Sequence, residues 1–345
     1  MLAAPRRLLD DDAEAIFEHF EAEGLGDGLP IIPPTEERVS RMLTATKRAG
    51  SEVLGQMPPA MSDVTLEKVA ICAVMAGCRP DYLPVLLTAV EVVLEPSWVL
   101  KSVQTTTNPM TPMVVVNGPV RSKIGLNSGT GVMGPGWRAN ATIGRALRLL
   151  LLDVGGARPG DVDKCTQGFS GKYTLCVGEN EEESPWAPYH VTRGFDPEIS
   201  AVTVVGVNSS TNIHDSSEDW RDLVHSFTGG LISPATANVA DPRSTPVIAL
   251  NPLHAQILNN AGWSRENLQE HIFKNCRLPA DGLSKRRAQL RREEDPEAFL
   301  VDGQIPFVND PGQIVVVVTG GIVGGHSCYL PNGHFGYVAT KAIAD

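Results

Sequence analysis

Apolar residues follow two different spacings in two parts of the chain. Segment 12–23 carries its apolar residues three or four positions apart and is followed by Gly24, which predicts a helix. Segments 65–78 and 83–94 are largely apolar and predict two further helices. We therefore expect residues 1–110 to form an N-terminal arm and a helical region.

From residue 113 onward the apolar residues come in short continuous runs, and each run ends in small polar residues. Such runs are typical of strands in a sheet that is covered on both faces. Two Gly-Trp motifs, within 136–140 and 262–267, each lead into an amphipathic helix. We interpret this as a repeated strand–loop–helix unit and predict an α/β fold around a mostly buried sheet over residues 111–345. The predicted strands are 113–116, 202–207, 247–250 and 314–318.

Asparagine follows three of these strands, at Asn117, Asn208 and Asn251. In α/β sheets ligands bind beyond the carboxyl ends of the strands, so we predict that these side chains contact substrate. The alternative is structural, because asparagine is also a common turn residue.

A loop of small residues over 123–136 contains Asn127 and Ser128 and leads into a predicted helix. Its backbone amides could bind an anion or a carboxylate, with Arg138 nearby. The loop contains one Gly-x-Gly-x-x-Gly, but Pro135 follows and no ribose-binding acid lies at the right distance. NAD is therefore an improbable cofactor.

Segment 163–186 combines a polar loop, a predicted strand over 172–177 and an acidic run that includes Glu179, Asn180 and Glu182. Clustered carboxylates repel one another unless a cation offsets them. Lys172 would lie at the far end of the strand, roughly 20 Å away at ~3.3 Å per residue. The partner must come from another chain segment, a metal ion or a ligand, unless the run is a solvated acidic turn.

The candidate catalytic residues are Lys172, Glu179, Glu182, His326 and Cys328. The last two follow a glycine turn at 320–325, where a histidine could activate a nucleophile. Cys165 is a further candidate nucleophile. Neither HExxH nor GxSxG occurs, so neither of these two motifs identifies a metal site or a serine hydrolase. Separate histidines could still converge on a divalent metal, and the metal ligands stay unknown.

Composition narrows the class of protein. The chain has 345 residues, a net charge of −11 and six cysteines without a CxxC pair. The negative charge argues against nucleic acid or an anionic membrane as partner. No apolar run approaches the ~20 residues of a membrane span. We expect reduced thiols, a cytoplasmic location and a homo-oligomer.

Several motifs together resemble the bacterial proteins of the UGSC-motif (seleno)protein group. The resemblance covers about 24–335 and implies a coherent family with a polar, carboxylate-rich site, without indicating a reaction. This chain has no UGSC tetrad, and Gly325-His326-Ser327-Cys328 matches it in part. The motifs are GDGLPIIPPT (26–35), AVMAGCRPDYLP (73–84), GPGWRANATIGRALRL (134–149), VGGARPGDVDKCTQGFSGKYTLCVGENEEESPW (154–186) and AGWSRENLQEHIF (261–273).

We therefore predict a small-molecule enzyme, a lyase or hydrolase that acts on a small polar metabolite, carboxylated or sulfur-containing. Lysine, glutamate or cysteine would supply acid–base or nucleophilic chemistry. The candidate residues would converge at the strand ends. The alternatives are an accessory subunit of a partner enzyme and a metal- or anion-binding protein. The predicted substrate-binding residues are Asn117, Asn127, Ser128, Arg138, Asn180, Asn208 and Asn251.

Overall fold

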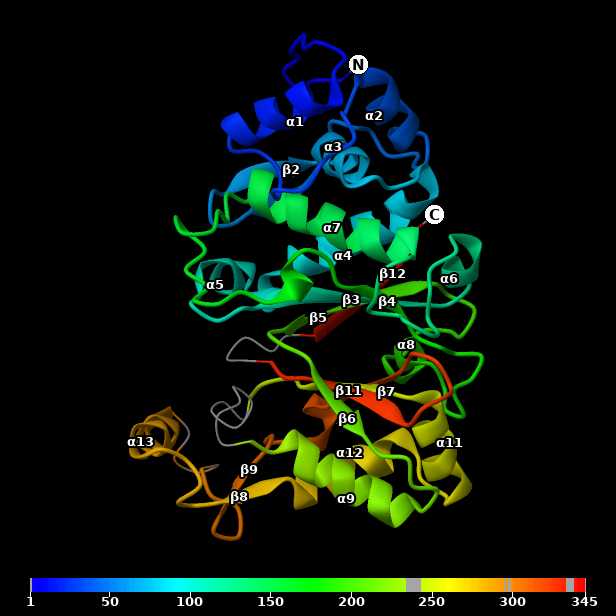
Figure 1. Cartoon of the computed structure of the whole chain (residues 1–345), viewed down its shortest axis with the longest axis vertical. Coiled ribbons are helices and arrows are strands. Elements are labelled where there is room, and N and C mark those ends of the chain that lie inside the picture. Colours follow the sequence, from blue (N-terminus) through cyan, green and yellow to red (C-terminus); the bar gives the residue numbers. More distant parts are fainter. Residues whose placement is uncertain (1, 234–242, 295, 297–298, 333–337, 345) are drawn as a thin grey trace.

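Two four-stranded sheets stack face to face, and helices cover the outer face of each sheet (Figure 1). The computed structural model describes residues 2–233, 243–294, 296, 299–332 and 338–344. The fold is α/β, as the sequence predicts, but it contains two main sheets instead of one mostly buried sheet.

The first sheet has the order β12-β5-β3-β4. Strand β3 runs parallel to β4 and antiparallel to β5, and β5 runs antiparallel to β12. The bounds are β3 Thr111–Asn117, β4 Cys176–Gly178, β5 Ala201–Val207 and β12 Val338–Ala342.

The second sheet has the order β10-β7-β11-β6. Strand β7 runs parallel to β10 and antiparallel to β11, and β11 runs antiparallel to β6. The bounds are β6 Thr211–His214, β7 Val247–Leu250, β10 Val315–Val318 and β11 His326–Leu330.

The two sheets repeat one topology and exchange their last strands. In each, a strand is followed by helices, a parallel neighbour and an antiparallel strand. The chain then crosses from β5 to β6 in the second sheet and from β11 to β12 in the first (Figure 1). The predicted repeated unit is therefore present, and the exchanged strands tie its two copies together.

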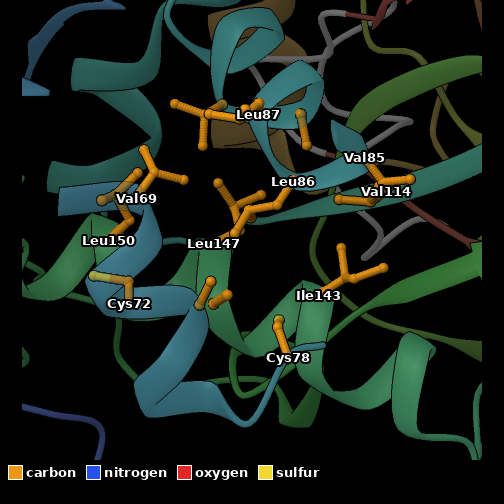
Figure 2. Packing of buried hydrophobic residues seen from close by; sticks show 14 of the residues in the cluster. Val69, Cys72, Cys78, Val85, Leu86, Leu87, Val114, Ile143, Leu147 and Leu150 are labelled. Carbon is orange, nitrogen blue, oxygen red and sulfur yellow. The ribbon is translucent and has the colours of Figure 1, made fainter. Parts of the chain in front are cut away.

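Helices α3 (Leu66–Ala76), α4 (Leu83–Val93) and α7 (Arg138–Asp153) cover the first sheet and share a core with it. Figure 2 shows Cys72 and Cys78 among the apolar side chains of this core. Helices α1 (Ala13–Ala22) and α2 (Glu36–Leu43) lie beyond α3 (Figure 1).

Helices α9 (Trp220–Leu231), α11 (Pro252–Asn260) and α12 (Arg265–Asn275) cover the second sheet. A third apolar cluster lies between the sheets and includes Val115, Val205 and Val317. The remaining elements are β1 Val53–Met57, β2 Ser62–Thr65, α5 Leu100–Thr105, α6 Val120–Lys123, α8 Tyr189–Thr192, β8 Arg277–Pro279, α13 Lys285–Glu294 and β9 Gln304–Pro306.

The strand predicted over 172–177 is wrong in its first four residues. Lys172 ends the 3-10 turn η3 (Ser170–Lys172), and β4 begins only at Cys176. The turn is held because Arg148 Nε donates to the carbonyl of Lys172 at 2.8 Å. A buried side chain distant in sequence thus overrides the local strand pattern.

Among the described residues, no single helix is long and apolar enough to cross a membrane. The adjoining segments Pro80–Val93 and Pro96–Thr105 would qualify together by length and composition, but they meet at a bend of 72°.

Gly144 and Gly229 give a matched pair of helix substitutions. A Cβ on Gly144 in α7 would lie 2.7 Å from the backbone nitrogen of Leu175, whereas one on Gly229 in α9 would meet nothing within 4 Å. Alanine favours a helix over glycine by about 1 kcal/mol. We expect Gly229→Ala to raise the free energy of unfolding by about 0.5–1 kcal/mol. Gly144→Ala should lower it by about 1–3 kcal/mol, because overpacking outweighs propensity. Urea denaturation measures both, and equal effects would contradict the described packing of α7.

Candidate functional site

Strand direction places the predicted site residues at opposite ends of the strands, and each such end of the sandwich is called an edge here. Because β5 runs antiparallel to β3, Val207 pairs with Thr111. Asn208 therefore lies at the edge opposite Asn117. Lys172 precedes β4, which is parallel to β3, so it too lies at the edge opposite Glu179. The expectation that these residues converge is wrong.

Glu179 is sealed in the interior directly after β4. Its side chain is 0% exposed, and Arg265 Nη2 donates to Oε1 at 3.0 Å. Asn117 Nδ2 at 2.5 Å and the amide of Tyr189 at 2.6 Å both donate to Oε2. Burial raises the pKa of Glu179 from 4.5, against the opposing effect of Arg265. Glu179 therefore joins the first lobe (the first sheet with α3, α4 and α7) to the second lobe (the second sheet with α9, α11 and α12), and Asn117 holds Glu179 instead of facing a substrate.

The next acidic side chains pair with Arg121 on α6. Arg121 Nη2 lies 2.7 Å from Glu181 and 3.0 Å from Glu182. The hydrogen bond from Arg121 lowers the pKa of Glu182, whose side chain is 62% exposed. The sequence left open whether the partner is another chain segment, a metal ion or a ligand, and the structure shows arginines of other segments, Arg121 and Arg265, which the sequence analysis did not name as partners. Arg121 comes four residues after Asn117, which follows a predicted strand, and Arg265 lies within the second Gly-Trp motif.

Most of the predicted asparagines hold loops at the carboxyl ends of β3, β4 and β7. Asn180 Nδ2 donates to the carbonyl of Gly320 at 3.1 Å, and Asn251 Nδ2 donates to that of Gly321 at 2.7 Å. Asn127 Oδ1 accepts from the amide of Gly129 at 2.9 Å, and the carbonyl of Ser128 accepts from the amide of Gly320 at 2.8 Å. These contacts give the residues structural roles.

The other predicted residues are scattered. Arg138 is exposed, and its Nε donates to the carbonyl of Gly77 at 3.0 Å. Cys328 packs between the sheets, where burial raises its pKa to about 11, which disfavours a nucleophilic thiolate. His326 is exposed and stacks on His214, with ring centroids 4.4 Å apart.

A buried histidine, His254, contacts Ser327, the residue after His326. The sequence identifies it only as one of the separate histidines that could converge on a metal. His254 Nδ1 lies 2.8 Å from the hydroxyl of Ser327, and Nε2 lies 2.9 Å from the carbonyl of Asp215. The side chain is 0% exposed, and burial lowers its pKa from 6.5. The signal that could have found it is its position just after the strand-end Asn251-Pro252.

His254 predicts acid sensitivity. Because its folded pKa lies below 6.5, the unfolded chain takes up the proton first. Its contribution to stability is complete above pH 6.5 and is lost as the pH falls toward the folded pKa. The slope is at most about 1.4 kcal/mol per pH unit. Urea denaturation between pH 7 and 5 should show a smaller slope for His254→Gln, and an unchanged slope would assign the effect elsewhere.

A pocket of about 520 Å³ opens at the amino end of β4 and contains Lys172. There Lys172 Nζ forms a close ion pair with Asp163 Oδ2, while Asp163 Oδ1 accepts from the amide of Cys165 at 2.9 Å. The lining residues are Asp27, Arg148, Leu152, Pro159, Asp163, Cys165, Thr166, Gln167, Gly168, Phe169, Ser170, Lys172 and Tyr173. Of the predicted catalytic residues, Lys172 lines this pocket, together with the further candidate Cys165.

Within the described ranges, no group of three or more histidine, cysteine, aspartate or glutamate side chains could hold a metal ion. No protein-family model matches the chain, and no curated protein matches it.

Proposed function

We propose that the protein is a cytoplasmic enzyme, a lyase or hydrolase, that converts a small polar metabolite in the pocket around Lys172. One observation carries the proposal. Within one concave site, a lysine and an aspartate in direct contact lie beside a half-buried cysteine. A pocket with a few convergent polar groups is the usual form of a small-molecule site.

Lys172 and Asp163 together can move a proton in either reaction. In an elimination, Asp163 accepts the proton from carbon, the bond to the leaving group breaks, and Lys172 protonates that group. In a hydrolysis, Asp163 takes the proton from water and Lys172 again protonates the leaving group. The proton then passes from Asp163 to the neutral amine across their hydrogen bond, which restores the ion pair.

Cys165 gives the pocket an alternative nucleophile. Its Sγ accepts from the amide of Gly168 at 3.2 Å, and the thiol is only half-buried. A thiolate there would be stabilised by that amide.

The accessory-subunit alternative has one observation in its favour. Three of the predicted catalytic residues lie apart: Lys172 lines the pocket, and neither Glu179 nor His326 does. Under that alternative the protein would act only with a partner enzyme.

The test is an untargeted NMR comparison of metabolite mixtures incubated with wild-type protein or with heat-inactivated protein. Mixtures from several bacterial extracts, each with and without added divalent metal, cover the substrate classes proposed. We expect one small polar metabolite to be consumed and its product to appear. Unchanged spectra in all mixtures would contradict the enzyme proposal and favour the accessory role.

A further inference from the structure

Arg148 is a buried cation at the wall of the Lys172 pocket. Among the described residues no carboxylate forms an ion pair with it, and the charge of Asp163 acts on it without direct contact. The residue is 8% exposed, and its Nε and Nη2 donate to the Lys172 carbonyl at 2.8 Å and the Thr111 hydroxyl at 3.1 Å. Both acceptors are neutral. Nη1 bonds to no described residue. It is not fully buried either, so it keeps contact with solvent.

The nearby carboxylates are already neutralised. Asp163 pairs with Lys172, and Asp27 receives two hydrogen bonds from Arg145, at 2.7 and 2.9 Å. Burial lowers the pKa of Arg148 to about 10, so the group is still cationic at neutral pH. Counted together with Arg145, which pairs with Asp27 from outside the pocket lining, three cations face two carboxylates here, in a chain whose net charge is −11. Burying a cation without a partner is costly, which favours an anionic ligand.

Arg148 donates a hydrogen bond to the turn before β4, and this role does not require a charge, because a neutral side chain does the same in the second lobe. There Gln269 of α12 donates to the carbonyl of Ile314 at 2.6 Å, just after the 3-10 turn η4 (Pro311–Gln313) and before β10. Arg148 of α7 holds the corresponding turn η3 before β4. The positive charge in the first lobe is thus left without a structural reason.

We propose that the pocket binds an oxyanion group of the substrate, a carboxylate or a phosphate, at Arg148 Nη1. The inference rests on the proposed function and names the substrate class of that site. Lys172 Nζ lies within the same wall and can share the anion, while Phe169 and Tyr173 line the pocket beside it. These rings suit the carbon skeleton of a small substrate. Because Nη1 is the free arm of the guanidinium, an oxyanion would complete its hydrogen bonding.

The experiment is isothermal titration of the full-length protein with benzoate, phenyl phosphate and neutral benzamide. Arg148→Gln copies the residue of the second lobe, because it keeps an amide donor and removes the charge. Arg138→Gln, on the same helix but exposed, is the matched control. Thermal unfolding without ligand checks that each variant folds, and Arg148→Lys, which keeps the charge, provides a second readout if Arg148→Gln is unstable.

We expect wild type and Arg138→Gln to bind at least one anionic probe and not benzamide. Arg148→Gln should bind that probe about 10- to 100-fold more weakly, with Arg148→Lys in between. Preference for benzoate identifies a carboxylate site, and preference for phenyl phosphate identifies a phosphate site. Equal binding by Arg148→Gln, or binding of benzamide as well, would overturn the inference, as would the absence of anion binding.

The two proposals fail in different ways. If anion binding depends on Arg148 but no metabolite is turned over, the proposed enzymatic function is contradicted and the anion site is supported. If a substrate without an anionic group is turned over, the enzymatic function is supported and the anion site is contradicted.

Discussion

Replacing Arg265 with alanine is expected to lower the free energy of unfolding by about 3–5 kcal/mol. The variant leaves Glu179 as a buried carboxylate without its cation, since Glu179 is 0% and Arg265 3% exposed. It also removes the 2.7 Å hydrogen bond from Arg265 Nη1 to the carbonyl of Ala187. Arg138→Ala is the control, because Arg138 begins α7 much as Arg265 begins α12 but is exposed.

Urea denaturation measures both variants, and we expect Arg138→Ala to change stability by about 0.5 kcal/mol or less. The pH dependence of the free energy of unfolding gives an independent test of the ion pair. Because the folded pKa of Glu179 is raised above 4.5, its contribution is present at low pH and is lost as the pH rises through the folded pKa. Without Arg265 this loss should grow. Similar costs for the two variants would contradict the role given to the ion pair.

Lys172→Met is expected to reduce kcat by about 10²- to 10⁴-fold for the substrate found in the NMR comparison. Methionine keeps much of the side-chain volume but neither donates nor accepts the proton. Lys164→Met is the control, because Lys164 is exposed in the same loop and, among the described residues, its Nζ donates only to the carbonyl of Gly160, at 2.8 Å. Steady-state kinetics measures both variants. A wild-type kcat for Lys172→Met would show that Lys172 takes no part in the reaction.

The sequence predicted several of the core helices and strands because their signals are local. The helix predicted over 12–23 is present as α1, where the side chain of Asp12 accepts from the amide of Ala15 at 2.8 Å. The continuous apolar runs were recognisable as buried strands, and β5 and β7 are buried throughout. The repeated Gly-Trp motifs do precede α7 and α12.

The site was harder to predict because it depends on strand direction. Asn117 and Asn208 each end a buried strand, and only the antiparallel pairing of β3 and β5 separates them. Arg148 looked like one more residue of an amphipathic helix. Its significance comes from the turn it holds and from the missing carboxylate, and both are relations between distant segments.

The most direct test of the central claim is a crystal structure of the protein with the substrate, or with the tightest-binding anionic probe. We predict density in the Lys172 pocket, with an oxyanion oxygen about 3 Å from Arg148 Nη1 and from Lys172 Nζ. Ligand bound instead at the carboxyl ends of the strands, beside Asn251 and His326, would contradict the account and restore the site that the sequence pattern indicated.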